Sequence, residues 1–191
     1  MNGSGEVIPE RYSIEVATPE DADQIRRLIR DSWVKTVGEV LGVAPERLEE
    51  VFEPSMSDEG LRKRKENLAH PPKGMYTFVA KDGARVLGVC IVQRHANESG
   101  ENELSILHVA PGQTWLGIGR SLWNEAEKKL DPTKDTFLWT TAGTIAAEVV
   151  YPRWEFEPVE YEVELLKIKE PVERPIVKML KKAKTSDTIS G

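Results

Sequence analysis

The pattern of apolar and polar positions alternates in some stretches and recurs every three or four residues in others, so it predicts both strands and helices. Residues 12–17 alternate as in a strand. Residues 18–21, Thr-Pro-Glu-Asp, then supply an N-cap, a first-turn proline and early acidic side chains, which is how a helix begins. The apolar side chains that follow share one helical face: Ala22, Ile25, Leu28, Ile29 and Trp33.

Residues 35–72 predict a second helical region. Pro45 opens one segment, and Ser57 caps another that ends before Pro71. The basic run at residues 62–65 is best explained as a solvated helix face.

A three-stranded meander is predicted next. Residues 75–80 and 85–93 form two strands joined by Asp82-Gly83, a tight-hairpin signal, and residues 103–109 form the third. A helix over residues 117–130 has an apolar inner face, and Asp131-Pro132 ends it.

The last predicted elements are a strand at 137–141, a helix at 144–151 and a final strand at 161–168. The order β-α-α-β-β-β-α-β-α-β predicts an α/β fold, a mixed sheet with helices on its faces. We expect one domain over residues 12–169, a flexible arm at 1–11 and a flexible proline- and lysine-rich tail at 170–191.

Composition narrows the functional classes. The 191 residues suit one domain, and no apolar run approaches the roughly 20 residues that a membrane span needs. The polar start lacks the features of a signal peptide, so a cytoplasmic location is expected. A net charge of −6 disfavours nucleic-acid binding and is compatible with a cationic substrate such as an amine.

The cysteine and histidines suggest no metal site or disulfide. Cys90 is the one cysteine and lies in an apolar run, which favours a core thiol over a catalytic one. His70, His95 and His108 are scattered along the chain, so no metal is expected.

The most informative chemistry lies in residues 104–122, a buried strand, a turn with Pro111 and a helix that opens on Gly117 and Gly119. Glycines at such a turn let the backbone approach an anion closely, and the first N–H groups of the helix lack partners. This stretch therefore predicts a phosphate or pyrophosphate site.

Val109-Ala110-Pro111, followed by Gly117-Ile118-Gly119, resembles the GNAT family of acyl-CoA-dependent N-acetyltransferases, and the similarity extends over residues 12–168. The segment 147–156, with Tyr151 followed by Phe156, resembles a second family motif. The resemblance implies acetyl-CoA or another acyl-CoA as co-substrate and a primary amine of a small molecule or peptide as acceptor. The cofactor-binding residues that it implies are Leu107, His108, Val109, Thr114, Trp115, Leu116, Gly117, Ile118, Gly119, Arg120 and Ser121.

The same resemblance implies direct attack by the amine within a ternary complex. Tyr151 inherits the role of the acid that protonates the departing thiolate, and a backbone N–H near residues 107–109 would polarise the acyl carbonyl. Glu103 is the first candidate for the general base, and the alternative is that it is an exposed glutamate with no catalytic role. His108 is the other candidate, although strand alternation favours a structural role for it. Trp33 and Tyr76 are candidates for an acceptor pocket or for the core.

Three positions depart from the family pattern. Thr114 stands where Gln or Arg is usual, Trp115 where Gly is frequent, and Glu155 replaces the Gly before Phe156. These departures keep open a noncatalytic module that senses acyl-CoA or binds a partner. Leu122, in place of a third glycine, argues against a dinucleotide site. The chain is also compatible with a homodimer.

Overall fold

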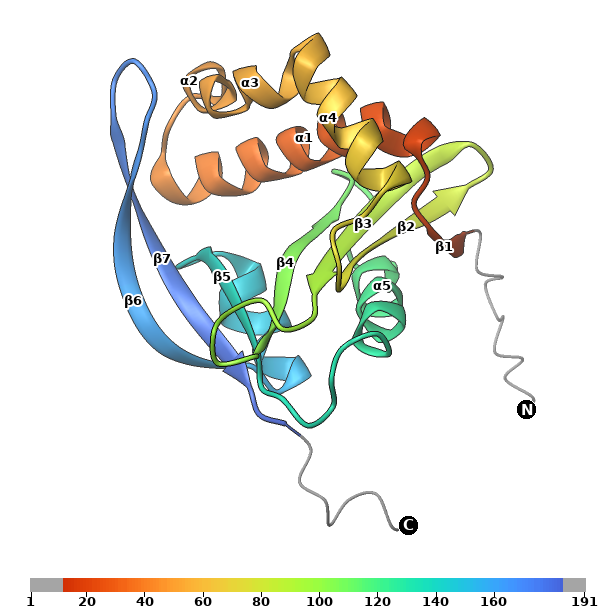
Figure 1. Ribbon diagram of the computed structural model, residues 1–191. Helices are drawn as coiled ribbons and strands as arrows, with labels where there is room; N and C mark the ends of the chain where they lie inside the picture. Colours follow the sequence, from red (N-terminus) through yellow and green to blue (C-terminus); the bar gives the residue numbers. More distant parts are fainter. Residues whose placement is uncertain (1–11, 184–191) are drawn as a thin grey trace, which may run out of the picture.

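A seven-stranded sheet forms the centre of the protein in a computed structural model, which describes residues 12–183 (Figure 1). Its strand order is β1-β2-β3-β4-β5-β7-β6, and every pairing is antiparallel except that of β4 with β5. The strands are β1 (Ser13–Val16), β2 (Met75–Asp82), β3 (Arg85–Gln93), β4 (Asn102–Val109), β5 (Thr136–Thr141), β6 (Glu157–Leu166) and β7 (Val172–Lys181).

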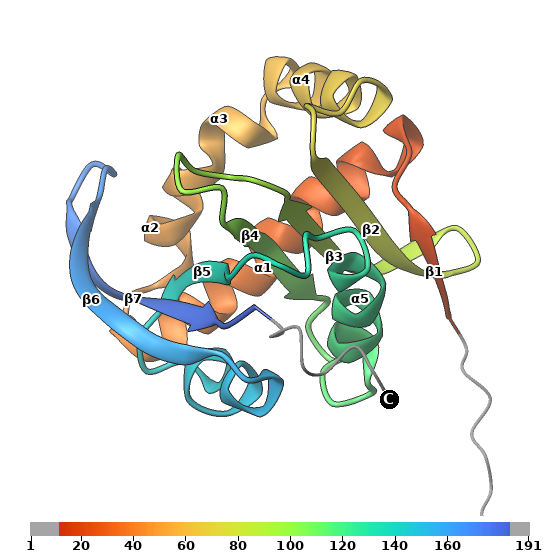
Figure 2. The ribbon, with the colours of Figure 1, turned by 60° about the horizontal axis from the view of Figure 1, so that its bottom comes forward.

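Four helices cover one face of the sheet, and a helix of 10 residues covers the other (Figures 1 and 2). On the first face lie α1 (Ala22–Leu41), α2 (Pro45–Glu49), α3 (Glu53–Met56) and α4 (Asp58–Ala69). On the second face lie α5 (Ile118–Glu127) and two short turns, η3 (Ala146–Val150) and η4 (Pro152–Trp154). The mixed sheet with helices on both faces confirms the predicted fold class.

Local signals account for several element boundaries. Ser57 caps α4 by accepting a hydrogen bond from the Gly60 N–H at 3.0 Å, as its position predicts. Pro45 begins α2, and Gly83 lies in the tight turn between β2 and β3 with a φ of 58°. The first part of the predicted helical region 35–72 is the end of α1, which runs unbroken to Leu41.

The main core lies between the sheet and α5. The inner face of α5 buries the four predicted positions, Ile118, Leu122, Ala126 and Leu130, although the regular helix ends at Glu127. Cys90 is fully buried in this cluster, as expected of a core thiol. A second cluster joins α1 to the other face of β2 and β3.

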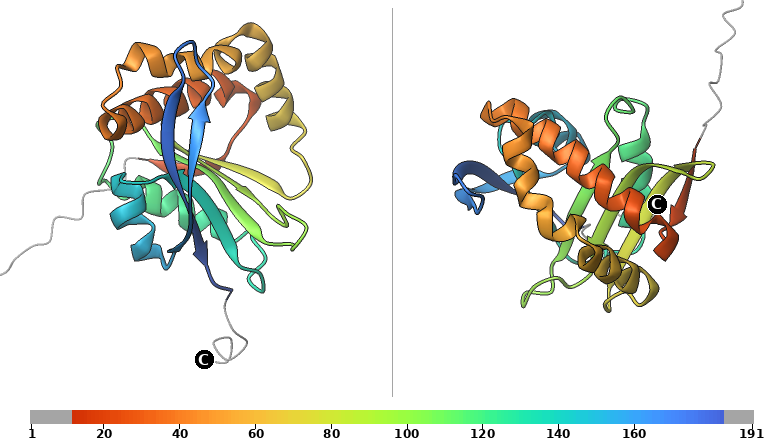
Figure 3. Two further views of the ribbon diagram at one scale, coloured as in Figure 1. Left: turned by 90° about the vertical axis from the view of Figure 1, so that its left-hand side faces the viewer. Right: turned by 90° about the horizontal axis from the view of Figure 1, so that it is seen from above.

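The predicted flexible tail is wrong for residues 172–181. This segment is strand β7, which pairs with β5 on one side and β6 on the other. The strand predicted at 161–168 is therefore not the last, and it begins earlier, at Glu157. Figure 3 shows the long hairpin of β6 and β7 curving past the helical layer. The predicted arm at 1–11 and the end of the tail, 184–191, lie outside the described residues.

No helix in the described part of the chain combines the length and the apolar character needed to cross a membrane.

Candidate functional site

The parallel strands β4 and β5 separate soon after they meet. Their register pairs are limited to Asn102 with Thr136 and Glu103 with Phe137. Two residues later, Ser105 is an extra residue in the ladder between β3 and β4, because Ile91 pairs with Ile106 and Val92 with Leu104. The bulge and the divergence leave backbone groups of β4 without a strand partner on the β5 side, where a ligand could use them.

The N-terminus of α5 lies beside this opening. Gly117 has a φ of 80°, a left-handed conformation that glycine adopts freely. Among the described residues, no acceptor faces the backbone N–H groups of residues 116–120. The Ser121 N–H, predicted to bind pyrophosphate, instead donates to the Gly117 carbonyl at 3.0 Å. The free amides and the positive end of the helix dipole suit an anionic group.

Gly119 faces the inner wall of this opening. A Cβ at Gly119 would lie 3.7 Å from Val109 Cγ2 and 3.9 Å from the Trp154 ring. The side chains of Leu107 and Val109 pack against the same core cluster, on the α5 face of β4. These predicted residues therefore share one face with the amides of α5.

Tyr12 also lies at the first turn of α5, although the sequence did not point to it. Its hydroxyl lies 3.1 Å from Ser121 Oγ and 3.7 Å from where a Cβ of Gly117 would be. It thus reaches the first turn of α5 from the start of β1, 109 residues away in the chain. A tyrosine before the first strand carries no local signal of this contact.

The loop before α5 keeps an unusual backbone despite its departures from the family pattern. Trp115 has a φ of 70°, a conformation that costs a non-glycine residue roughly 1–2 kcal/mol. Thr114, Trp115 and Leu116 are all exposed, so none of these side chains contributes to the core. Trp115 therefore keeps a backbone conformation typical of glycine, and its bulky side chain faces solvent.

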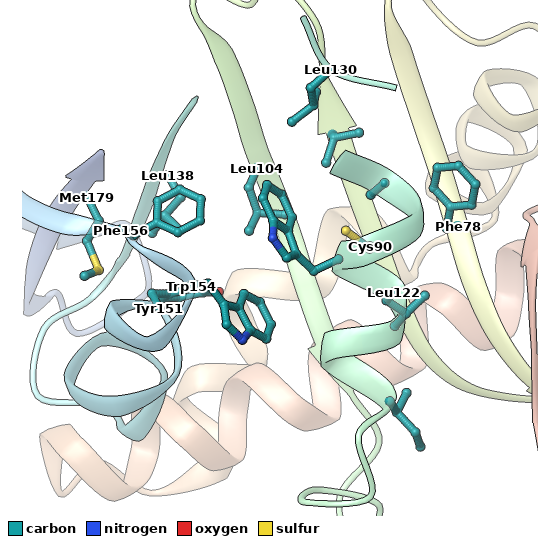
Figure 4. Packing of buried hydrophobic residues seen from close by; sticks show 14 of the residues in the cluster. Phe78, Cys90, Leu104, Leu122, Leu130, Leu138, Tyr151, Trp154, Phe156 and Met179 are labelled. Atoms are coloured by element: carbon teal, nitrogen blue, oxygen red, sulfur yellow. The ribbon is translucent and has the colours of Figure 1, made fainter. Parts of the chain in front are cut away.

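Tyr151 directly follows η3, in the segment after β5. Its ring packs edge-on against Trp154 and Phe156, with centroids 5.9 and 6.0 Å away (Figure 4). Burial, and to a lesser degree the neighbouring Cys90 thiol, raise the pKa of its hydroxyl. Tyr151 is therefore a buried, protonated group on the α5 face of the sheet.

Aromatic stacking connects η4 to α5. The rings of Trp123 and Trp154 are stacked at 6.2 Å, and the Arg120 guanidinium lies 5.6 Å from the Trp154 centroid. Arg120 is thereby held at the first turn of α5. Glu155 has a φ of 69°, and its exposed carboxylate lies 3.4 Å from Lys181 Nζ, directed to solvent. The carboxylate that replaces the usual glycine thus lies near the C-terminal end of α5, because Lys181 also pairs with Glu127, the last residue of that helix.

The opposite face of β4 carries different chemistry. His108 points toward α1, where its Nδ1 lies 3.1 Å from Ser32 Oγ, and burial lowers its pKa to about 4. The strand alternation expected from the sequence is confirmed, and the His108 side chain lies on the opposite face of β4 from Leu107 and Val109. Glu103 is half-buried and, by alternation with buried Leu104, lies on the α1 face.

Arg174 of β7 also lies on this α1 face and was missed because its segment was expected to be a loose tail. Its guanidinium lies 5.5 Å from the Trp33 ring centroid and donates to Thr141 Oγ1 at 3.2 Å. Trp33 packs edge-on against Phe52. Tyr76, the other candidate for the acceptor pocket or the core, packs with the α5-face cluster.

Two cavities lie away from the point where β4 and β5 separate. One of about 480 Å³ is bordered by α1 and α2, and one of about 250 Å³ by the end of α5 and the last residues of β7. Within residues 12–183, no three His, Cys, Asp or Glu side chains are grouped so as to hold a metal ion.

Comparisons with known proteins agree with this architecture. A family model described as an acetyltransferase (GNAT) domain matches residues 35–169. By sequence, none of the curated proteins compared with this chain matches it.

Solved structures share the fold at low identity. The PaiA N-acetyltransferase from Thermoplasma acidophilum, in complex with coenzyme A, is 19% identical with a TM-score of 0.66, covering 90% of this chain and 98% of that one. A ribosomal-protein-alanine N-acetyltransferase from Brucella melitensis is 20% identical with a TM-score of 0.63, covering 88% and 98%. An acetyltransferase from Thermus thermophilus is 16% identical with a TM-score of 0.60, covering 89% and 96%.

Proposed function

This chain belongs to the GNAT acetyltransferase family, and we propose that it transfers the acetyl group of acetyl-CoA to a primary amine of a small molecule or peptide. The observation that carries the proposal is the juxtaposition of three features: free amides at the N-terminus of α5, the separated strands β4 and β5, and the buried hydroxyl of Tyr151. The structural neighbours named N-acetyltransferases support nitrogen as the acceptor atom.

The residues at α5 fit the pyrophosphate of the co-substrate. The N–H groups of residues 116–120 would bind its oxygens, with the Arg120 side chain adding positive charge. The Tyr12 hydroxyl is placed to add one more hydrogen bond at the first turn. Thr114 supplies no charge, so the backbone and Arg120 would carry most of the recognition.

Acetyl-CoA supplies an activated thioester, and the chain's own groups assist its reaction with the amine. The unpaired backbone near the Ser105 bulge is suited to polarise the acyl carbonyl through an N–H group. The Tyr151 hydroxyl, kept protonated by burial, is suited to give its proton to the departing thiolate. This pathway needs no covalent intermediate with the enzyme.

The amine would approach from the α1 face, where a base can remove its proton. Glu103 lies on that face at the last register pair before the strands separate, which suits a base that acts directly or through water. His108 stays neutral at pH 7 because of its lowered pKa, but its Nδ1 is engaged with Ser32. We therefore assign the role of general base to Glu103 and a structural role to His108.

An acetylation assay over a panel of primary amines tests the proposal. Product would be detected by mass spectrometry as the acetylated amine, and binding by thermal shift with acetyl-CoA. We expect Glu103→Gln to lower kcat by roughly 10²-fold at neutral pH with little change in acetyl-CoA binding. Glu98→Gln, in the loop before β4, is the matched control and should behave as the wild type.

Each negative result has a distinct meaning. If no acyl-CoA stabilises the protein, the cofactor assignment fails and so does the enzymatic function. If acetyl-CoA binds tightly and no amine in the panel is acetylated, the noncatalytic acyl-CoA sensor, which the exchange at Thr114 keeps open, becomes the better assignment.

A further inference from the structure

The outer strand of the β6–β7 hairpin exposes a row of apolar side chains. Tyr161, Val163 and Leu165 are 70%, 66% and 54% exposed, and Val159, at a bulge in the ladder with β7, is 54% exposed. We call these four residues the β6 row. An apolar patch of this kind on a surface strand is typical of an interaction site.

The register places three members of the β6 row, Tyr161, Val163 and Leu165, on one face of the hairpin. Tyr161 pairs with Val177, which is buried in the core on the α5 side, and Val163 pairs with Pro175. The three intervening residues, Glu160, Glu162 and Glu164, alternate onto the α1 side. The hairpin therefore has one apolar face and one charged face, on which Glu160 lies opposite Lys178 and Glu164 opposite Arg174, and the charged face is directed away from the row.

We propose that the β6 row is the contact surface of a homodimer, in which the rows of two copies pack face to face in antiparallel orientation. The hairpin carries Val163 and Leu165 of the row beyond the end of β5, since Thr141, the last residue of β5, pairs with Ile176 and Val163 pairs with Pro175. Figure 1 shows β6 as the outermost strand at that side of the molecule. A second copy can therefore reach the row without displacing any element.

Charge favours packing through the faces over pairing through the strand edges. Two β6 edges paired as one continuous sheet would bring the glutamates of both copies next to one another, which is unfavourable. Face-to-face packing keeps the charged faces, with their glutamates and the paired Arg174 and Lys178, on the outside. Glu173 lies opposite Leu165, at one end of the row. In an antiparallel dimer this end of one row lies against the opposite end of the second row, so the Glu173 side chains of the two copies stay apart.

The surface area that two rows would bury agrees with a weak but specific dimer. Side chains of this size and exposure leave roughly 100 Å² each open, so two rows bury roughly 800 Å², and about 1,000 Å² with the exposed Pro175 included. This value lies at the lower limit for specific interfaces. We expect a dissociation constant on the order of micromolar.

The dimer goes beyond the proposed transferase activity and leaves the site open. Arg174 and Trp33 lie on the opposite face from the β6 row, on the side from which the amine would approach. Each copy would thus keep its own complete site.

Sedimentation velocity of the full chain from about 1 to 100 µM tests the proposal. The wild type should shift from the 21.5 kDa of one chain toward twice that mass as concentration rises. Val163→Arg, which places a charge in the centre of the row, should weaken association at least tenfold. Val16→Arg is the matched control, because Val16 is also a strand valine with 66% exposure, and it should associate as the wild type.

Two results would overturn the dimer. One is a wild type that stays at 21.5 kDa throughout the range, and the other is a Val163→Arg variant that associates as strongly as the wild type. Leu165→Lys repeats the test at the other end of the row if Val163→Arg fails to fold. Acetylation is measured on the same samples, so a monomer with intact turnover refutes the dimer alone.

Discussion

Replacing Tyr151 by phenylalanine removes one hydroxyl and leaves the packing intact. The ring contacts with Trp154 and Phe156 do not involve the oxygen. The free energy of unfolding should change by less than about 1 kcal/mol.

The effect on catalysis should be much larger. A positioned general acid contributes roughly 10²- to 10⁴-fold, and we expect kcat to fall by about 10²-fold, or about 2.7 kcal/mol of activation free energy. The KM for acetyl-CoA should change by less than about threefold, because the hydroxyl acts on charge that develops only as the thiolate leaves. Since burial raises the pKa of Tyr151, the wild type should keep this acid protonated through the neutral and mildly alkaline range.

The assay is the release of free CoA thiol at saturating acetyl-CoA and amine. Tyr76→Phe is the matched control, because Tyr76 is another tyrosine packed against the same core cluster, and its kcat should equal that of the wild type. A kcat of Tyr151→Phe within about threefold of the wild type would refute the acid role. A loss that parallels a fall in melting temperature would mean that Tyr151 acts through packing.

Three further predictions concern stability. Burial lowers the pKa of His108 to about 4, against about 6.5 in the unfolded chain, so the unfolded state binds more protons between these two pH values. The free energy of unfolding of the wild type should therefore fall by up to about 3 kcal/mol as the pH falls through this window. Urea unfolding at each pH should show that His108→Gln lacks this part of the loss. Gly88→Ala should lower the free energy of unfolding by about 1–3 kcal/mol, because its Cβ would lie 2.9 Å from Leu122 Cδ1 and 3.0 Å from Ile118 Cγ2; an unchanged melting curve would contradict this packing. Trp115→Gly should raise the free energy of unfolding by about 1 kcal/mol by relieving the left-handed backbone, whereas Trp115→Ala, which keeps a Cβ, should give no such gain in thermal melts.

Elements with a strong local signal could be predicted from the sequence. The turn at Gly83, the cap at Ser57 and the inner face of α5 depend on residues close together in the chain, and all three occur as expected. The α5 N-terminus is of the same kind, because Pro111, Gly117 and Gly119 lie close together in the chain. Its participation in a site was suggested by the family resemblance and by the physics of helix termini.

Strand β7 could not be predicted because its stability comes from distant partners. Pro171, Pro175 and the lysines suggested a loose tail, and only Val177 and Met179 of the strand are buried. The pairing with β5 and β6 overrides these local preferences. Arg174 was missed as a site residue for the same reason, and Tyr12 because its contact spans most of the chain.

The position of β7 also explains why β4 and β5 can stay apart. All six residues of β5 pair with β7, from Thr136 with Lys181 to Thr141 with Ile176, whereas β4 matches only two of them. Every residue of β5 is thus paired along the β7 edge, and β5 follows the twist of β7. For β5 to pair further with β4, the longer ladder between β5 and β7 would have to bend. The strand that the sequence failed to predict is therefore the one that holds the candidate site open, and shortening it should affect acetyl-CoA binding before it affects the core around α5.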